Sequence, residues 1–72
     1  MDWCKIFGEN VRSSRLQAGL TQEELAADGR IDVTYLRGIE AGRRNPSLRV
    51  IGRLAAALGT DPAHLVAAPL EP

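Results

Sequence analysis

The sequence holds very few of the residues that build disulfides or metal sites. Cys4 and His64 are the single cysteine and the single histidine among 72 residues. One cysteine excludes an internal disulfide, and one cysteine with one histidine cannot complete a Cys/His zinc site. We therefore predict a domain without metal, cofactor or internal disulfide, of the kind found in a reducing cytoplasm.

Long apolar runs and aromatic residues are also scarce. No run approaches the roughly 20 residues of a membrane span, or the shorter apolar centre of a secretory signal. Trp3, Phe7 and Tyr35 are the only aromatic residues, so the core is expected to be aliphatic. The sequence has neither a glycine-rich phosphate loop nor a nucleophile that could partner His64, which argues against an enzyme.

The alternation of apolar and polar residues that is typical of strands is nowhere sustained, whereas helix start and stop residues recur at short spacing. Thr21 and Glu24 are spaced as a capping box, and Asp61 precedes a proline suited to the first helical position. The expected helices cover about residues 4–17, 22–28, 33–40, 48–58 and 62–67. The predicted fold class is all-α, with residues 1–72 forming one compact five-helix domain.

Apolar residues at helical spacing predict the core. The residues expected to point inward are Ile6, Phe7, Val11, Leu25, Ala26, Leu36, Ile39, Leu48, Ile51, Leu54, Ala55 and Leu58. On a helical wheel of residues 33–40, Thr34, Arg37, Gly38 and the following Ala41 point outward. An ordinary solvated helix face would more often carry Glu and Lys. This small, polar face instead suits close approach to another molecule.

The charges sum to zero but are unevenly distributed. Residues 30–53 hold six arginines and two acidic residues, a net charge of +4, and the segments on either side carry −2 each. One basic stretch in a neutral chain predicts a basic face, which a protein needs to bind a DNA duplex. A solvated arginine-rich surface is the alternative.

Several motifs occur together in a familiar order. GLTQEELA is followed by IDVTYLRGIEAG, then by RRNPSL and LAAALG. This order and spacing resemble the helix-turn-helix family of lambdoid phage repressors and Cro, and look most like the small controller proteins of restriction–modification systems. The resemblance runs from about Phe7 to Val66. It implies a helix-turn-helix over about residues 21–40 and a DNA-binding transcriptional regulator whose third helix enters the major groove of double-stranded DNA.

The resemblance also implies individual contacts. Gln22, Val33, Thr34 and Gly38 match positions that contact bases or phosphates in the family, with Gly38 supplying clearance alone. Arg44 matches a DNA-contacting arginine, for which either phosphate or the edge of guanine is suitable.

Four further residues are DNA-contact candidates: Tyr35, Arg37, Arg43 and Asn45. Arg37 could instead pair with Asp32 or remain in solvent, Tyr35 could pack half-buried, and Asn45 could shape its loop. Val33 could instead pack against its own helix, as an alternative to an apolar contact with a thymine methyl group. Arg15 and Glu40 match an ion pair that joins the first and third helices of phage repressors.

Three positions depart from the family pattern. Arg30 stands where a glycine is usual in the turn, so either Arg30 adopts a left-handed conformation at about 1 kcal/mol of strain or the turn shifts toward Gly29. Val33 replaces a polar residue, and Ser14 is small where relatives often carry a larger side chain. These departures concern the DNA target rather than the fold.

The expected assembly is a homodimer, because one small domain makes few phosphate contacts and a two-fold dimer reads two half-sites. The last helix with its capping residue, about residues 61–67, has more apolar residues than the core requires, and Leu65, Val66 and Leu70 are the interface candidates. The alternative function is an antitoxin or adaptor that binds a partner protein and represses its own operon.

Overall fold

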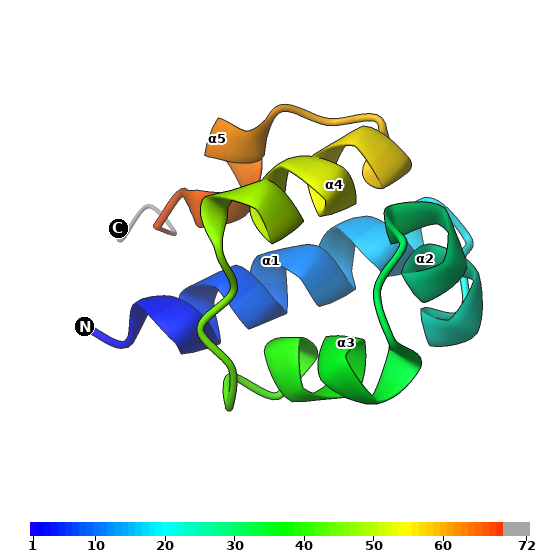
Figure 1. Cartoon of the computed structure of the whole chain (residues 1–72). Helices are drawn as coiled ribbons and strands as arrows, with labels where there is room; N and C mark the ends of the chain where they lie inside the picture. Colours follow the sequence, from blue (N-terminus) through cyan, green and yellow to red (C-terminus); the bar gives the residue numbers. More distant parts are fainter. Residues whose placement is uncertain (69–72) are drawn as a thin grey trace.

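The computed structural model describes residues 1–68, which form five α-helices and no strand (Figure 1). The helices are α1 (Trp3–Gln17), α2 (Gln22–Gly29), α3 (Val33–Glu40), α4 (Leu48–Leu58) and α5 (Pro62–Val66). This confirms the predicted all-α fold, and each boundary lies within one residue of the prediction. Within residues 1–68 no helix is long and apolar enough to cross a membrane.

Side-chain caps set the beginnings of the helices. The Thr21 hydroxyl accepts from the backbone N–H of Glu24 at 3.0 Å, and the Glu24 carboxylate accepts from the N–H of Thr21 at 2.9 Å. The capping box predicted from the sequence is thus present, and its hydrogen bonds lower the pKa of Glu24. Asp2 caps α1 by accepting from the N–H of Lys5, which is why α1 begins at Trp3.

Arg30 adopts the left-handed conformation, with φ 59° and ψ 44°, so the first of the two alternatives for this turn is correct. Gly29 is the last residue of α2 and is buried. A Cβ atom on Gly29 would lie 3.3 Å from Cδ2 of Leu54. Gly29 thus lies at the contact between α2 and α4, and the left-handed C-cap of α2 is the next residue, Arg30.

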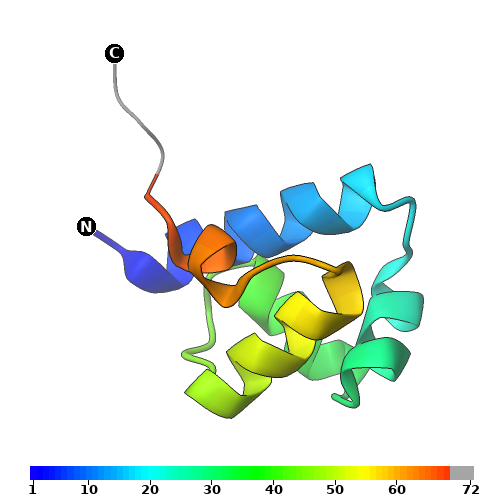
Figure 2. The same ribbon diagram turned by 90° about the horizontal axis from the view of Figure 1, so that it is seen from above.

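In the view of Figure 1, the long helix α1 runs between α3 below it and α5 above it. It packs against α3 and α5, while α2 packs against α3 and α4. Seen from above in Figure 2, α5 again lies beside the N-terminal part of α1. Asn10 fastens these two helices, because its Nδ2 donates to the backbone carbonyls of Leu65 and Ala67, both at 2.9 Å.

The core is aliphatic apart from Phe7, as expected. The buried apolar residues are Phe7, Val11, Leu25, Ala26, Leu36, Ile39, Leu54, Ala55 and Leu65. Ile6, Ile51 and Leu58 are only half-buried. The prediction for Leu48 is wrong, because this side chain is 86% exposed. It shares the apolar stripe of α4 but sits in the first turn, where no neighbouring helix covers it.

The closest approach between α1 and α3 depends on Gly8. A Cβ atom at this position would overlap the backbone carbonyl oxygen of Ile39 and would lie 3.0 Å from that of Glu40. The missing side chain therefore lets the backbones of the two helices touch. This contact sets how α3 is placed on the domain.

Candidate nucleic-acid interface

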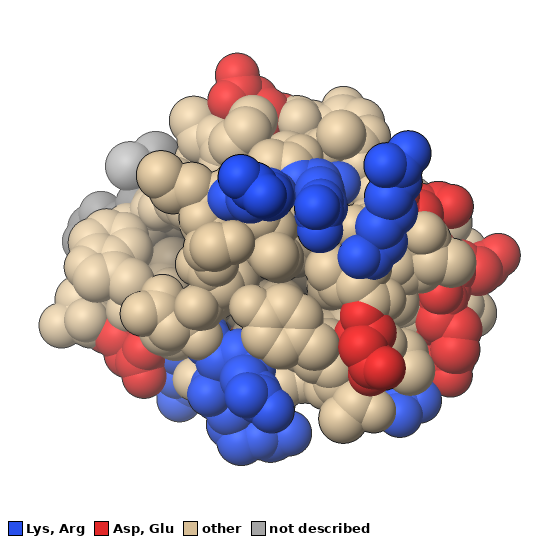
Figure 3. Space-filling view, in the orientation of Figure 1, with Lys and Arg blue, Asp and Glu red and all other residues tan. Residues whose placement is uncertain are grey.

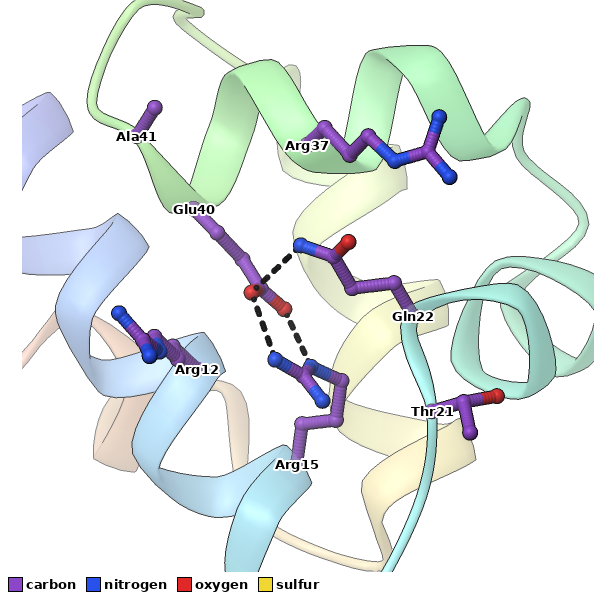
Figure 4. A pocket seen from close by; sticks show the side chains of 7 residues that line it. All are labelled: Arg12, Arg15, Thr21, Gln22, Arg37, Glu40 and Ala41. Atoms are coloured by element: carbon purple, nitrogen blue, oxygen red, sulfur yellow. Dashed lines mark hydrogen bonds and ion pairs between the residues drawn. The ribbon is translucent and has the colours of Figure 1, made fainter.

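A buried ion pair joins α1 to the end of α3 (Figure 4). Arg15 Nε donates to Glu40 Oε2 at 2.8 Å and Nη2 donates to Oε1 at 3.1 Å, while Nη1 donates to the carbonyl of Leu20 at 2.9 Å. The side chains of Arg15 and Glu40 are 10% and 5% exposed. Their hydrogen bond raises the pKa of Arg15. The pair expected from the resemblance is therefore present, with both partners held in one geometry.

Gln22 extends this pair toward the surface. Its Nε2 donates to Glu40 Oε1 at 3.1 Å, so the first residue of α2 is tied to the last residue of α3 (Figure 4). The sequence predicted Gln22 as a DNA contact and did not predict this bond. An amide nitrogen carries two hydrogens, and one of them is still available to another acceptor.

An open cleft of about 550 Å³ lies over these residues, between α1, the start of α2 and α3. Its lining is mostly polar: Arg12, Arg15, Thr21, Gln22, Arg37, Glu40 and Ala41 (Figure 4). Arg12 is exposed and was not predicted as a site residue. It stands three residues before Arg15, on the same face of α1, and this spacing could have identified it.

The outward face of α3 begins at Thr34, which is exposed. Its backbone N–H donates to Oδ1 of the capping Asp32 at 2.7 Å. The cap therefore uses the backbone of Thr34 and not its hydroxyl group. Val33 and Tyr35, the neighbours of Thr34, are half-buried and pack against the core. Val33 is thus positioned mainly by its own domain, as one of its two sequence interpretations expected.

Arg37 pairs with Glu23 of α2. The sequence suggested Asp32 as its possible partner instead. Its Nη2 donates to Glu23 Oε2 at 3.2 Å, and the two side chains are 49% and 67% exposed. The carboxylate of Asp32 is used as the helix cap. A pair this exposed contributes little to stability, and the Arg37 guanidinium stays beside the cleft.

The chain leaves α3 through a tight, hydrogen-bonded turn. Gly42 adopts a φ of +78°, the N–H of Arg43 donates to the carbonyl of Gly38 at 2.9 Å, and the N–H of Gly42 donates to that of Ile39 at 3.0 Å. These are the two bonds of a Schellman motif. The turn places Arg43 and Arg44, both exposed, directly after α3.

Gly38 is buried rather than open to an approaching molecule, because the side chain of Arg44 covers it. A Cβ atom on Gly38 would lie 2.8 Å from Arg44 Cγ and 3.3 Å from Arg44 Nε. The space predicted beside Gly38 is present, but the Arg44 side chain of the same chain fills it. The Arg44 guanidinium carbon lies 5.8 Å from the centre of the Tyr35 ring.

Asn45 lies apart from the cleft, on a small groove of about 120 Å³ between α1, α4 and α5. The groove is mainly apolar and is lined by Trp3, Cys4, Phe7, Asn45, Ile51 and Val66. The prediction that Leu65 contributes to a dimer interface is wrong, because its side chain is fully buried in its own core. Val66 is 42% exposed, and Leu70 lies outside the described residues.

Comparison with known proteins decides what this arrangement is. The sequence profile of the helix-turn-helix family matches residues 11–65. An uncharacterized helix-turn-helix transcriptional regulator of Sinorhizobium fredii is 42% identical over 66 residues, 92% of this chain and 86% of that protein. Control protein C.BamHI of Bacillus amyloliquefaciens is 40% identical over 62 residues, 85% of this chain and 76% of that protein. The chain belongs to the lambda-repressor-like helix-turn-helix family.

The tertiary structure agrees with this membership. The restriction-modification controller protein C.AhdI from Aeromonas hydrophila matches with a TM-score of 0.84 and 42% identity, over 86% of this chain and 94% of that chain. In this chain, α2 and α3 are two short helices joined by a tight turn that contains Arg30. The family is one of DNA-binding transcriptional regulators without enzymatic activity, which confirms the function class predicted from the sequence.

The basic side chains visible in Figure 3 gather mainly in two areas, with a smaller one at the lower right. One area extends over α4, and the other lies at the lower left, where the chain leaves α3; acidic residues gather over α2 at the right edge. All six arginines of residues 30–53 are exposed, as the basic stretch predicted. They do not form a single face, because α4 returns across the domain and carries Arg49 and Arg53 with it.

Proposed function

We propose that this chain is a sequence-specific regulator that binds double-stranded DNA as a homodimer and inserts α3 into the major groove. The observation that carries the proposal is the outward surface of α3. Thr34 and Arg37 are exposed there, and Arg43 and Arg44 follow at once in a hydrogen-bonded turn. An α-helix fits a major groove about 12 Å wide, and arginines beside it can reach either phosphates or bases.

In this proposal Gln22, Arg12, Arg37 and Arg43 bind the DNA backbone. Gln22 begins α2, where the free backbone N–H groups and the helix dipole favour a phosphate, and its remaining amide hydrogen can donate to the same group. Arg12 on α1 and Arg37 on α3 line the cleft from two helices and add positive charge (Figure 4). Such contacts fix the position of the protein on the duplex without reading sequence.

Thr34 and Arg44 are proposed to read bases. Thr34 lies in the first turn of α3, the part that enters the groove deepest, and its hydroxyl can donate to or accept from a base edge. The guanidinium of Arg44 can contact guanine O6 and N7 together, which discriminates by about 1–3 kcal/mol. The exposed part of Val33 can contact a thymine methyl group.

The proposed dimer interface is the apolar surface around the groove of Trp3, Ile51 and Val66. Trp3 is 56% exposed and Val66 42% exposed, and the 86% exposed Leu48 begins the helix that carries Ile51. A second copy of the chain covers this surface in the proposal. The dimer then presents two α3 helices to half-sites about 34 Å apart, one turn of the duplex.

DNA binding is tested by selecting bound duplexes from a random pool and then measuring their affinity at several salt concentrations. With about three phosphates neutralised per subunit, the slope of log affinity against log salt should be about −5. Arg43→Ala should reduce the slope by about one per subunit. Arg53→Ala on α4 is the matched control and should leave it unchanged. An affinity independent of salt would contradict the proposal.

The dimer is tested by sedimentation of the purified protein at tens of micromolar. Val66→Asp should yield monomers that bind the selected duplex more weakly. Leu16→Asp places the same charge on the 57% exposed Leu16 of α1 and should leave the dimer intact. A wild-type protein that is monomeric both alone and on DNA would exclude the two-fold assembly.

A further inference from the structure

Three residues of one short segment pack together on the outward side of α3. Tyr35 and Gly38 are one turn apart on the helix, and Arg44 returns to them from the loop that follows. Arg44 lies against the bare backbone of Gly38, where Cγ, Nε and Cδ stand 2.8, 3.3 and 3.6 Å from the place of a Cβ atom. Any larger residue at position 38 would occupy the space that the Arg44 side chain fills.

The Tyr35 ring is the second group that packs near the Arg44 side chain. The Arg44 guanidinium carbon lies 5.8 Å from the ring centre, within the range of a cation–π contact. Tyr35 itself is half-buried and packs against the core, so its ring is held from behind. A flexible arginine therefore rests between a fixed ring and a fixed helix backbone.

The turn between α3 and Arg44 is fixed as well. The N–H of Arg43 donates to the carbonyl of Gly38 at 2.9 Å, so the residue that accommodates Arg44 also anchors the loop. The Arg44 backbone is one residue from this bond. Both the start and the end of the Arg44 side chain are thus tied to α3.

We infer that Tyr35 and Gly38 are positioning residues for Arg44, holding its guanidinium beside the base-reading face of α3 before DNA arrives. The inference rests on the proposed function, and the ligand of Arg44 in it is the O6/N7 edge of a guanine. A side chain that is already ordered loses less conformational freedom on binding. Tyr35 and Gly38 therefore determine how strongly the protein distinguishes guanine at that position, without contacting it.

The test compares Tyr35→Leu with Tyr35→Phe on the duplex that the wild-type protein selects. Leucine keeps the apolar packing and removes the ring, whereas phenylalanine keeps both the packing and the ring. Tyr35→Leu should weaken binding to the selected duplex about two- to fivefold, the size of one exposed cation–π contact, while Tyr35→Phe should not. Affinity for a scrambled duplex should be unchanged in both variants.

A double-variant cycle separates positioning from direct contact. In an Arg44→Ala background, Tyr35→Leu should have no further effect on the affinity for the selected duplex. A loss of the same size in that background would overturn the inference and make Tyr35 a DNA contact in its own right. A loss in Tyr35→Phe would overturn it as well, and would assign the contact to the hydroxyl group.

Two further measurements keep the inference falsifiable if Tyr35→Leu does not fold or if no duplex is selected. Gly38→Ala displaces Arg44 yet suits a helix, so it should keep the melting temperature and lose preference for the selected duplex. In the free protein, ring-current shifts of the Arg44 side-chain protons should persist in Tyr35→Phe and vanish in Tyr35→Leu. Absent shifts in the wild-type protein would refute the positioning role, whereas failure to select any duplex would refute the proposed function alone.

Discussion

The two faces of α3 are built on opposite principles. On the inner face, Gly8 lets the backbone of α1 touch that of α3, and Glu40 is held by Arg15 with both side chains at most 10% exposed. On the outer face, Thr34 is exposed and Arg37 pairs with Glu23 across solvent. The inner face fixes where the helix lies, and the outer face can change its chemistry without altering that placement.

The two ion pairs of α3 show the same contrast. The Arg15–Glu40 pair makes two hydrogen bonds in a buried setting, whereas the Arg37–Glu23 pair makes a single bond at 3.2 Å between exposed groups. Removing one partner from a buried pair leaves an uncompensated charge, while an exposed charge returns to water. Breaking an arginine–glutamate pair should therefore reduce stability much more in the buried setting than in the exposed one.

The largest effect is expected from Glu40→Ala. It leaves the buried Arg15 guanidinium without its partner, which should lower the free energy of unfolding by about 3–5 kcal/mol. A domain of this size has a total stability of about 4–11 kcal/mol at roughly 0.05–0.15 kcal/mol per residue. Urea unfolding followed by circular dichroism measures the change. Glu23→Ala is the matched control and should cost no more than about 1 kcal/mol; equal losses would refute the contrast.

Gly8→Ala is expected to follow, with a loss of about 1–3 kcal/mol from overpacking. The added methyl group overlaps the carbonyl of Ile39, so α3 must move away from α1. The control is Gly52→Ala in α4, where nothing lies within 4 Å of the added atom. This control should gain about 0.5–1 kcal/mol, because alanine favours the helix. A neutral Gly8→Ala would mean that α1 and α3 do not touch through their backbones.

Thr34→Ala should leave the free energy of unfolding within about 0.5 kcal/mol of wild type, since Thr34 is a surface residue. The binding free energy for the selected duplex should weaken by about 1 kcal/mol, the typical contribution of one hydrogen bond. The binding free energy for scrambled DNA should not change. Titration of the two labelled duplexes measures both. A loss of stability would place Thr34 with the inner face.

The smallest effect concerns Glu24, whose pKa is lowered by the hydrogen bonds to Thr21. A lowered pKa in the folded state means that the carboxylate stabilises α2 fully above the pKa of the unfolded chain. This contribution is lost as the pH falls through the lowered pKa. Glu24→Gln should therefore melt at a lower temperature than wild type at neutral pH, and the gap should close in acid. A gap independent of pH would exclude the carboxylate as its cause.

Local chemistry made most of the fold predictable. Capping residues such as Thr21 and Asp61 act within three or four residues of themselves, so the helix boundaries could be inferred from the sequence without knowing what packs against what. The bidentate Arg15–Glu40 pair was expected only because the sequence resembles a family in which it occurs. The base-reading roles of Thr34 and Arg44 have the same origin and are still predictions.

Only the tertiary structure decided which residues distant in the chain contact one another. It also decided which of several possible partners a side chain binds. The sequence determined that Leu65 is apolar and helical, but only the packing of α5 on α1 made it core instead of interface. Leu48 shares its helical stripe with buried residues and is exposed because no helix covers the first turn of α4. Glycine has no side chain whose type predicts a contact, so the closeness of Gly8 to α3 appears only once the two backbones are placed together.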